Sequence, residues 1–163
     1  MKLNVYQPET YQLSRRLRGM QDIYFVVHDR MHIKGFEFTP SPRAFALNRI
    51  VESDQIYGDD YTIEADRITG IGNNVSLVFT DLDFGESGAT KLTICGRAPH
   101  GNNSIHVQFS GQDGESRQII EFPASKEYQE LSFPLERVTG KQTVTFIFMP
   151  GSNFDFDWFR FEV

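Results

Sequence analysis

The chain ends in a segment in which apolar and polar residues alternate. Phe154, Phe156 and Trp158 are separated by single carboxylates. A period of two is typical of a β-strand, whose successive side chains point to opposite faces of the sheet. Beyond this point the apolar residues change parity, to Phe159 and Phe161. Because a regular strand keeps its parity, we predict a β-bulge in this strand or burial of both of its faces.

Similar short alternations, separated by turn residues, fill the chain from residue 44 onward. They recur at intervals of roughly 8–12 residues, which is typical of antiparallel sandwiches and barrels. The segment 54–60 is predicted to be a loop and 70–74 a turn. The predicted strands cover residues 44–53, 61–66, 75–79, 90–95, 104–109, 117–122, 127–135, 142–149 and the C-terminal segment. No long stretch has a helical period, so the pattern predicts an all-β fold.

Two prolines interrupt the pattern before this region. Pro40 and Pro42 cannot both continue a hydrogen-bonded ladder, and they favour an extended, semi-rigid spacer. We therefore predict a linker at residues 39–44, followed by a β-sandwich module at residues 45–163.

The first 38 residues resemble the end of that module. We predict strands at residues 10–17, 22–27 and 31–38; residues 23–27 correspond to 144–148, and 33–38 to 156–161. The same change of parity recurs in both copies, which independent strands rarely share, so we interpret the similarity as an internal repeat.

Three strands do not form a stable unit alone, so this partial repeat must pack on something. It would be the terminal strands of a preceding like module, or strands added to the main sandwich. A third possibility is exchange between two chains to give a dimer.

Composition excludes several classes of partner. The formal net charge of −6 argues against nucleic acid. No apolar run approaches bilayer length, which argues against a membrane-spanning segment, and no secretory signal is present. Cys95 is the single cysteine, so no intrachain disulfide is possible. These observations leave the compartment open.

Three motifs together suggest a family. They are Gly72-Asn73-Asn74-Val75 before a strand, a strand that ends in Pro134-Leu135, and the closing Asp155-Phe156-Asp157-Trp158-Phe159. With them, residues 52–163 resemble a family 6 carbohydrate-binding module, a galactose-binding-like jelly-roll β-sandwich. More narrowly, residues 56–59, 70–75 and 91–97 are similar to modules that follow the catalytic core of family 2 glycoside hydrolases, chiefly β-galactosidases.

The resemblance implies a structural calcium ion near the first and last strands. It places Glu52 and Asp157 as the candidate ligands. Calcium takes several oxygens, from carboxylates and carbonyls together. Where the family usually supplies a second acidic residue, this chain has Asn48, Arg49 and Ile50.

The resemblance also implies a sugar cleft in the loops at one end of the sandwich, built from two aromatic platforms and an amide. Sugar rings present CH faces that stack on aromatic rings, while polar groups orient the hydroxyls. The first platform position is Leu77, and the second falls near Ser125 or Lys126. Since neither is aromatic, tyrosines of the nearby loop are the alternative platforms. The candidate sugar-binding residues are Tyr57, Tyr61, Leu77, Asn153 and Asp155.

Two hypotheses about function remain. The first is a non-catalytic, carbohydrate-binding-like accessory domain of a β-galactosidase-type glycoside hydrolase, with a glycan and the parent's catalytic domain as partners. The alternative is a structural or interaction sandwich without a sugar site, which packs on the catalytic core or on a second copy. A catalytic role is disfavoured, because Asp81 and Asp83 have no evident partner and no nucleophile elbow, phosphate loop or zinc motif is present.

Overall fold

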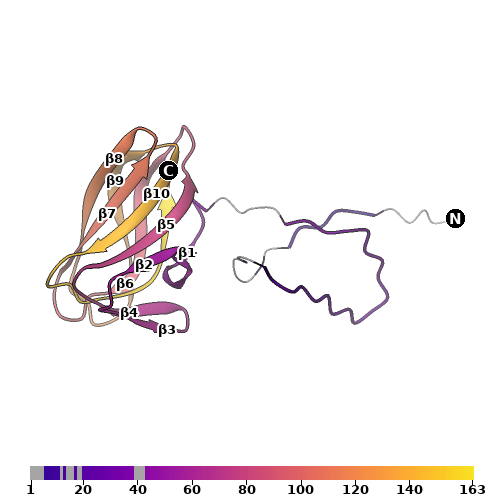
Figure 1. Cartoon of the computed structure of the whole chain (residues 1–163), viewed down its shortest axis with the longest axis horizontal. Coiled ribbons are helices and arrows are strands. Elements are labelled where there is room, and N and C mark those ends of the chain that lie inside the picture. Colours follow the sequence, from indigo (N-terminus) through magenta and orange to yellow (C-terminus); the bar gives the residue numbers. More distant parts are fainter. Residues whose placement is uncertain (1–5, 12, 14–16, 18–19, 39–42) are drawn as a thin grey trace. The chain divides into compact units, whose positions relative to one another are not determined.

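The computed structural model describes residues 6–11, 13, 17, 20–38 and 43–163. The chain divides into two compact units, residues 1–40 and residues 41–163. Among the described residues, every strand belongs to the second unit (Figure 1). No helix in the described part of the chain is long and apolar enough to cross a membrane.

The second unit is a sandwich of two antiparallel sheets, which confirms the predicted all-β fold. One sheet has the order β3-β4-β11-β6-β9, with β1 also paired to β11, and the other has the order β2-β5-β10-β7-β8. The strands are β1 (Asn48–Arg49), β2 (Gln55–Tyr57), β3 (Thr62–Glu64), β4 (Arg67–Ile71), β5 (Val75–Asp83), β6 (Ala89–Arg97), β7 (Asn103–Gly111), β8 (Gly114–Phe122), β9 (Gln129–Val138), β10 (Lys141–Phe148) and β11 (Phe154–Glu162). A short 3₁₀ helix, η1 (Ile50–Glu52), follows β1.

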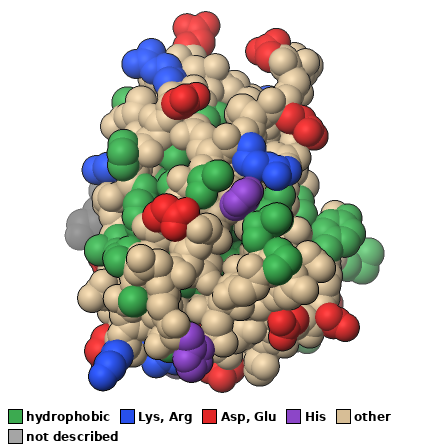
Figure 2. Space-filling model, turned by 90° about the vertical axis from the view of Figure 1, so that its left-hand side faces the viewer, with side chains coloured by type: hydrophobic (Ala, Val, Ile, Leu, Met, Phe, Trp, Pro, Cys, Tyr) green, Lys and Arg blue, Asp and Glu red, His purple; other side chains and the backbone are tan. Residues whose placement is uncertain are grey.

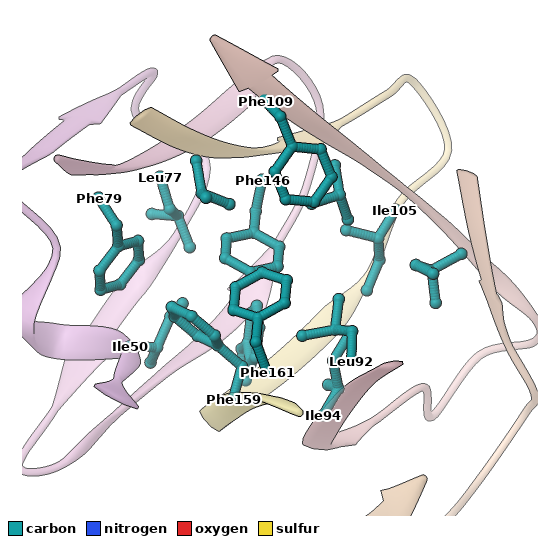
Figure 3. Packing of buried hydrophobic residues seen from close by; sticks show 14 of the residues in the cluster. Ile50, Leu77, Phe79, Leu92, Ile94, Ile105, Phe109, Phe146, Phe159 and Phe161 are labelled. Atoms are coloured by element: carbon teal, nitrogen blue, oxygen red, sulfur yellow. The ribbon is translucent and has the colours of Figure 1, made fainter. Parts of the chain in front are cut away.

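Phenylalanines from both sheets fill the space between them (Figure 3). The ring centroid of Phe159 on β11 lies 4.7 Å from those of Phe79 and Phe146, which come from β5 and β10 of the facing sheet. The two pairs are edge-on or tilted, the arrangement that aromatic quadrupoles favour. The last strand is therefore the element that joins the two layers.

The parity change in β11 is a bulge, as predicted. The pairing of β11 with β6 shifts register between Phe156 and Trp158. Consequently Phe154, Phe156, Phe159 and Phe161 all face the core and are fully buried, although their spacing is irregular. The extra residue lets one strand keep a continuous apolar inner face on both sides of the irregularity.

Three local predictions in the second unit were wrong in detail. Residues 44–53 form the two-residue β1 and η1 instead of one strand. The predicted loop 54–60 contains β2, and the predicted turn 70–74 overlaps the end of β4. These strands are short, so their hydrophobic pattern is too brief to distinguish them from loops.

The first unit differs from the prediction. None of its described residues lies in a strand, so the predicted strands at 22–27 and 31–38 are not formed, and much of the predicted strand 10–17 lies outside the described residues. Pro40 and Pro42 of the predicted linker also lie outside them. The physical reason is that strand ladders need a partner sheet, and a three-strand segment has too little apolar burial to hold one.

The described apolar residues of the first unit are exposed. Phe25, Phe36 and Phe38 are each more than half exposed, although their rings contact one another. In the repeat they correspond to Phe146, Phe159 and Phe161, which are buried in the sandwich core. That the segment is the end of a preceding like module stays a prediction.

Deleting residues 1–40 separates the alternatives for this segment. If it belongs to another sandwich, the truncated module should keep the same melting temperature within about 2 °C, because a compact unit of this size carries its own core. Binding of a hydrophobic dye such as ANS should fall, because exposed phenylalanines are removed. Circular dichroism and dye fluorescence measure the two effects. A large loss of stability would instead favour strands added to the main sandwich.

Candidate functional site

One row of side chains crosses the outer face of the five-stranded sheet. Strand pairing places one residue of each strand side by side, in the order Tyr57, Ser76, Ile147, His106 and Ile119. Leu77, Phe146 and Val107, the central members of the alternate row, are fully buried, so this row points outward. Tyr57 and Ile119, at its two ends, are each 57% exposed. The row forms a strip of one tyrosine and two isoleucines with Ser76 and His106 between them.

A row of four polar residues and one valine, called the polar row below, runs beside this strip. It consists of Gln55, Val78, Thr145, Gln108 and Arg117 in the same strand order. The guanidinium of Arg117 donates to Oε1 of Gln108 over 2.7 Å, and the hydroxyl of Tyr57 donates to Oε1 of Gln55 over 2.8 Å. We name the two rows together the sheet face. It offers an apolar surface with amide, hydroxyl and guanidinium groups directly alongside.

Charge is dispersed over the side of the module drawn in Figure 2. Acidic and basic side chains are scattered there singly, with hydrophobic and histidine side chains between them. A broad patch of one sign, which would attract a strongly charged ligand, is not present on this side.

The structure places Tyr57 and Tyr61 differently. Tyr57 ends β2 and is exposed, and the turn after it requires glycine: Gly58 has φ 95°, and a Cβ there would lie 2.6 Å from the carbonyl oxygen of Asn74. Tyr61 is half-buried and packs against the core. The two tyrosines therefore do not form one exposed pair.

Leu77 is not available to a ligand. Its side chain is fully buried in the core (Figure 3), since it alternates with the outward-facing Ser76. Ser125, at the second platform position, is also buried, and its hydroxyl accepts from the backbone N–H of Ala98 over 3.1 Å. Both positions are therefore structural in this chain.

Asp155 is buried and its carboxylate is fully engaged. Oδ1 accepts from the backbone N–H of Gly70 over 2.8 Å, and Oδ2 accepts from Nε and Nη2 of Arg97 over 2.7 and 2.6 Å. It lies on β11 of the other sheet, so it does not share the sheet face with Tyr57. Asn153, just before it, is half-buried, and its backbone N–H donates to Asn103.

Tyr128 continues this cluster and was not identified from the sequence. The guanidinium carbons of Arg67 and Arg97 lie 4.4 and 5.1 Å from its ring centroid. Burial raises the pKa of Tyr128, and the hydrogen bond to Asp155 raises the pKa of Arg97. Tyr128 is half-buried, and both arginines make cation–π contacts with its ring.

The sequence signals for the sheet face were weak. Ile119 directly precedes the buried Ile120, and Ile147 lies between the buried Phe146 and Phe148. Adjacent residues of a strand point to opposite faces of the sheet, so one member of each apolar pair must face outward. Without the strand order, nothing in the sequence brings these residues together with His106.

The predicted calcium ligands already have cationic neighbours. Oδ1 of Asp157 lies 2.6 Å from Nη1 of Arg49, and Oδ2 lies 3.7 Å from Nη2 of Arg67. The backbone carbonyl of Glu52 accepts from Nη2 of Arg43 over 3.0 Å. Within the described residues, no group of three or more His, Cys, Asp or Glu side chains could hold a metal ion. As arranged, this donor set does not fit a calcium ion.

A comparison with protein families found one match. The family described as Carbohydrate binding module (family 6) matches residues 51–163. Among curated protein sequences, none matches this chain.

Solved structures share the fold. A module from Clostridium stercorarium, solved with cellobiose, is 23% identical, with a TM-score of 0.64 over 73% of this chain and 94% of that one. A family 6 module from Clostridium cellulolyticum, solved with xylose, is 17% identical, with a TM-score of 0.63 over 74% and 98%.

A larger enzyme contains a similar region. A family 43 arabinoxylan arabinofuranohydrolase from Bacillus subtilis, solved with cellotetraose, is 20% identical, with a TM-score of 0.58. The alignment covers 72% of this chain and 27% of that one.

Replacing Asp155 by asparagine tests whether this carboxylate stabilises the fold. Asp155→Asn removes the buried negative charge that pairs with Arg97. We expect the free energy of unfolding to fall by about 2 kcal/mol. Asp66→Asn is the matched control, because the carboxylate of Asp66 also lies beside arginines but is half-exposed. An exposed ion pair of this kind should contribute less than about 1 kcal/mol to the free energy of unfolding. Urea unfolding measures both. Equal stability of the two variants would contradict the structural role of Asp155.

Proposed function

The chain belongs to the family 6 carbohydrate-binding modules, which are non-catalytic binding domains, and we propose that it binds a neutral oligosaccharide on the sheet face. The observation that carries this proposal is the row that ends in Tyr57 and Ile119. The neighbouring polar row, two residues away along each strand, supplies hydrogen-bonding groups on the same face.

The chemistry of the two rows matches a sugar chain. A pyranose ring presents CH groups on its faces and hydroxyls at its edge, so it stacks on an apolar or aromatic surface and hydrogen-bonds beside it. Tyr57 supplies the exposed aromatic ring, while Gln55, Gln108 and Thr145 supply amide and hydroxyl groups. Arg117 is the one Lys or Arg among the ten residues of the sheet face, so this face lacks the basic patch that a polyanion would need.

Weak affinity is expected at such a site. The sheet face is open, so a ligand stays partly hydrated and gains little from desolvation, while its ordering still costs free energy. Cellobiose and xylose, bound to the two Clostridium modules, are neutral sugars of the proposed class. They guide the choice of probes for this chain.

We propose that the chain is an accessory domain of a β-galactosidase-type hydrolase. Support comes from residues 56–59, 70–75 and 91–97, which are similar to modules that follow such catalytic cores. Its role would be to hold a glycan near the catalytic domain, and the catalytic domain would be its structural partner.

One set of observations favours the alternative, a sandwich without a sugar site. Leu77 and Ser125 are buried where the family's aromatic platforms are expected, and Asp155 is engaged by Arg97. The loop cleft that the resemblance implied therefore lacks its platforms. For this reason we place the proposed binding on the sheet face and not in the loops.

The test is a glycan array of the purified chain, followed by calorimetric titration of any oligosaccharide that binds. Galactosides, cello-oligosaccharides, xylo-oligosaccharides and β-1,3-glucans are the probes. We expect Tyr57→Ala to weaken binding about 5- to 10-fold, because a stacked ring contributes roughly 1 kcal/mol beyond its buried area.

Two matched controls make the test specific to the sheet face. Ile119→Ala should weaken binding, whereas Ile63→Ala should not, although the two isoleucines are 57% and 56% exposed. Tyr24→Ala removes an exposed tyrosine of the first unit and should also have no effect. Absence of binding to every probe by the folded chain would favour the structural domain, and equal effects of Ile119→Ala and Ile63→Ala would exclude the sheet face.

A further inference from the structure

The carboxylate of Asp157 lies in a setting that already supplies positive charge. Its side chain is 12% exposed, and its two oxygens face different guanidinium groups, Oδ1 that of Arg49 and Oδ2 that of Arg67. A buried carboxylate needs a compensating charge or hydrogen bonds. Arginine meets that need here, at the position where the family resemblance implies a calcium ligand.

Arg49 also makes the connection that a bridging metal would make. It lies on β1, which pairs with β11 through Asn48 opposite Phe159 and Arg49 opposite Trp158. These two pairs are the whole ladder between the first and last strands. Two residue pairs are too few to hold β1 against β11 by backbone hydrogen bonds alone. The ion pair between Arg49 and Asp157 therefore stabilises the pairing of these two strands.

A second arginine fills an oxygen-rich site next to η1. The Arg43 side chain is 4% exposed, its guanidinium donates to the carbonyls of Glu52 and Thr80 over 3.0 and 2.8 Å, and it forms an ion pair with Asp54. It also lies 4.9 Å from the ring centroid of Phe79. One carboxylate and two carbonyls are oxygens of the kind that calcium binds, and here a planar guanidinium satisfies them.

We infer that Arg49 and Arg43 take the place of the family's structural cation, so that this sandwich folds and remains stable without calcium. A divalent ion beside Asp157 would approach two guanidinium groups that already neutralise the carboxylate, and their repulsion disfavours it. Both substituting charges come from residues 43–49, which enter the sandwich immediately before η1. Calcium independence is a property of these residues and does not depend on sugar binding.

The wild-type chain gives the first measurement. Its melting temperature in millimolar calcium chloride and in excess EDTA should agree within about 1 °C, since an ion that does not bind the native state cannot stabilise it. A site filled to a thousand times its dissociation constant would raise the melting temperature by roughly 10 °C. A rise of that size in wild-type protein would overturn the inference.

Substitutions at position 49 give the second measurement of the same inference. Arg49→Gln should lower the melting temperature by about 5 °C, because Asp157 loses its nearest charge. Arg160→Gln is the matched control: the Arg49 and Arg160 side chains are 42% and 43% exposed, but the partner of Arg160 is the more exposed Glu162. Its loss should be about 1 °C. Equal losses in the two variants would overturn the role of Arg49.

Arg49→Glu tests whether the guanidinium and calcium compete for one position. This variant restores an acidic residue where the family usually supplies one. We expect it to be less stable than wild type in EDTA and to regain several degrees in calcium but not in magnesium, since calcium accepts more irregular oxygen geometry. A folded variant with no calcium response would contradict the shared position, and the Arg49→Gln comparison stands even if the acidic variant does not fold.

Discussion

The burial of one face of β11 is the constraint on which the rest of the sandwich depends. Four phenylalanines of this strand lie in the core, and Phe159 contacts rings from two strands of the opposite sheet. Since each fully buried phenylalanine contributes roughly 2–3 kcal/mol, this one strand supplies a substantial part of the cohesion between the layers. The bulge after Phe156 is required for all four rings to face inward.

Because phenylalanines occupy the inner face of β11, the polar residues that alternate with them lie on its outer face. The strand's two aspartates point away from the core yet are nearly buried, so each needs a positive partner. Arg97 serves Asp155, and Arg49 with Arg67 serves Asp157. The result is a row of alternating charges across the six-stranded sheet, held together by ion pairs and by the ring of Tyr128. Groups committed to one another in this way are poor ligands for a sugar or a metal.

The sequence predicted the parts of the fold that repeat a strong pattern. Long strands with clear alternation, such as β7 and β10, and the bulge in β11 were all identified. The two-residue β1 was predicted as part of a longer strand, and the three-residue β2 was assigned to a loop, because so few residues define no period. The candidate site was harder to predict, because a residue can bind a ligand only if its side chain is exposed. Leu77 is buried and Asp155 is paired with Arg97, and both facts depend on residues that are distant in the sequence. Of the candidate sugar-binding residues, Tyr57 is the one that lies exposed on the sheet face. The residues that join it come from four other strands.

The two outer faces would separate stability from the sugar recognition proposed above. On the six-stranded sheet, charged side chains pair internally and connect β1, β4, β6 and β11. On the five-stranded sheet, Tyr57 and Ile119 remain exposed, and the polar groups beside them face solvent. Binding there would require no rearrangement of the buried charges, because the core lies between the two faces. A change at Arg49 should therefore alter stability without altering sugar affinity, whereas a change at Tyr57 should do the reverse.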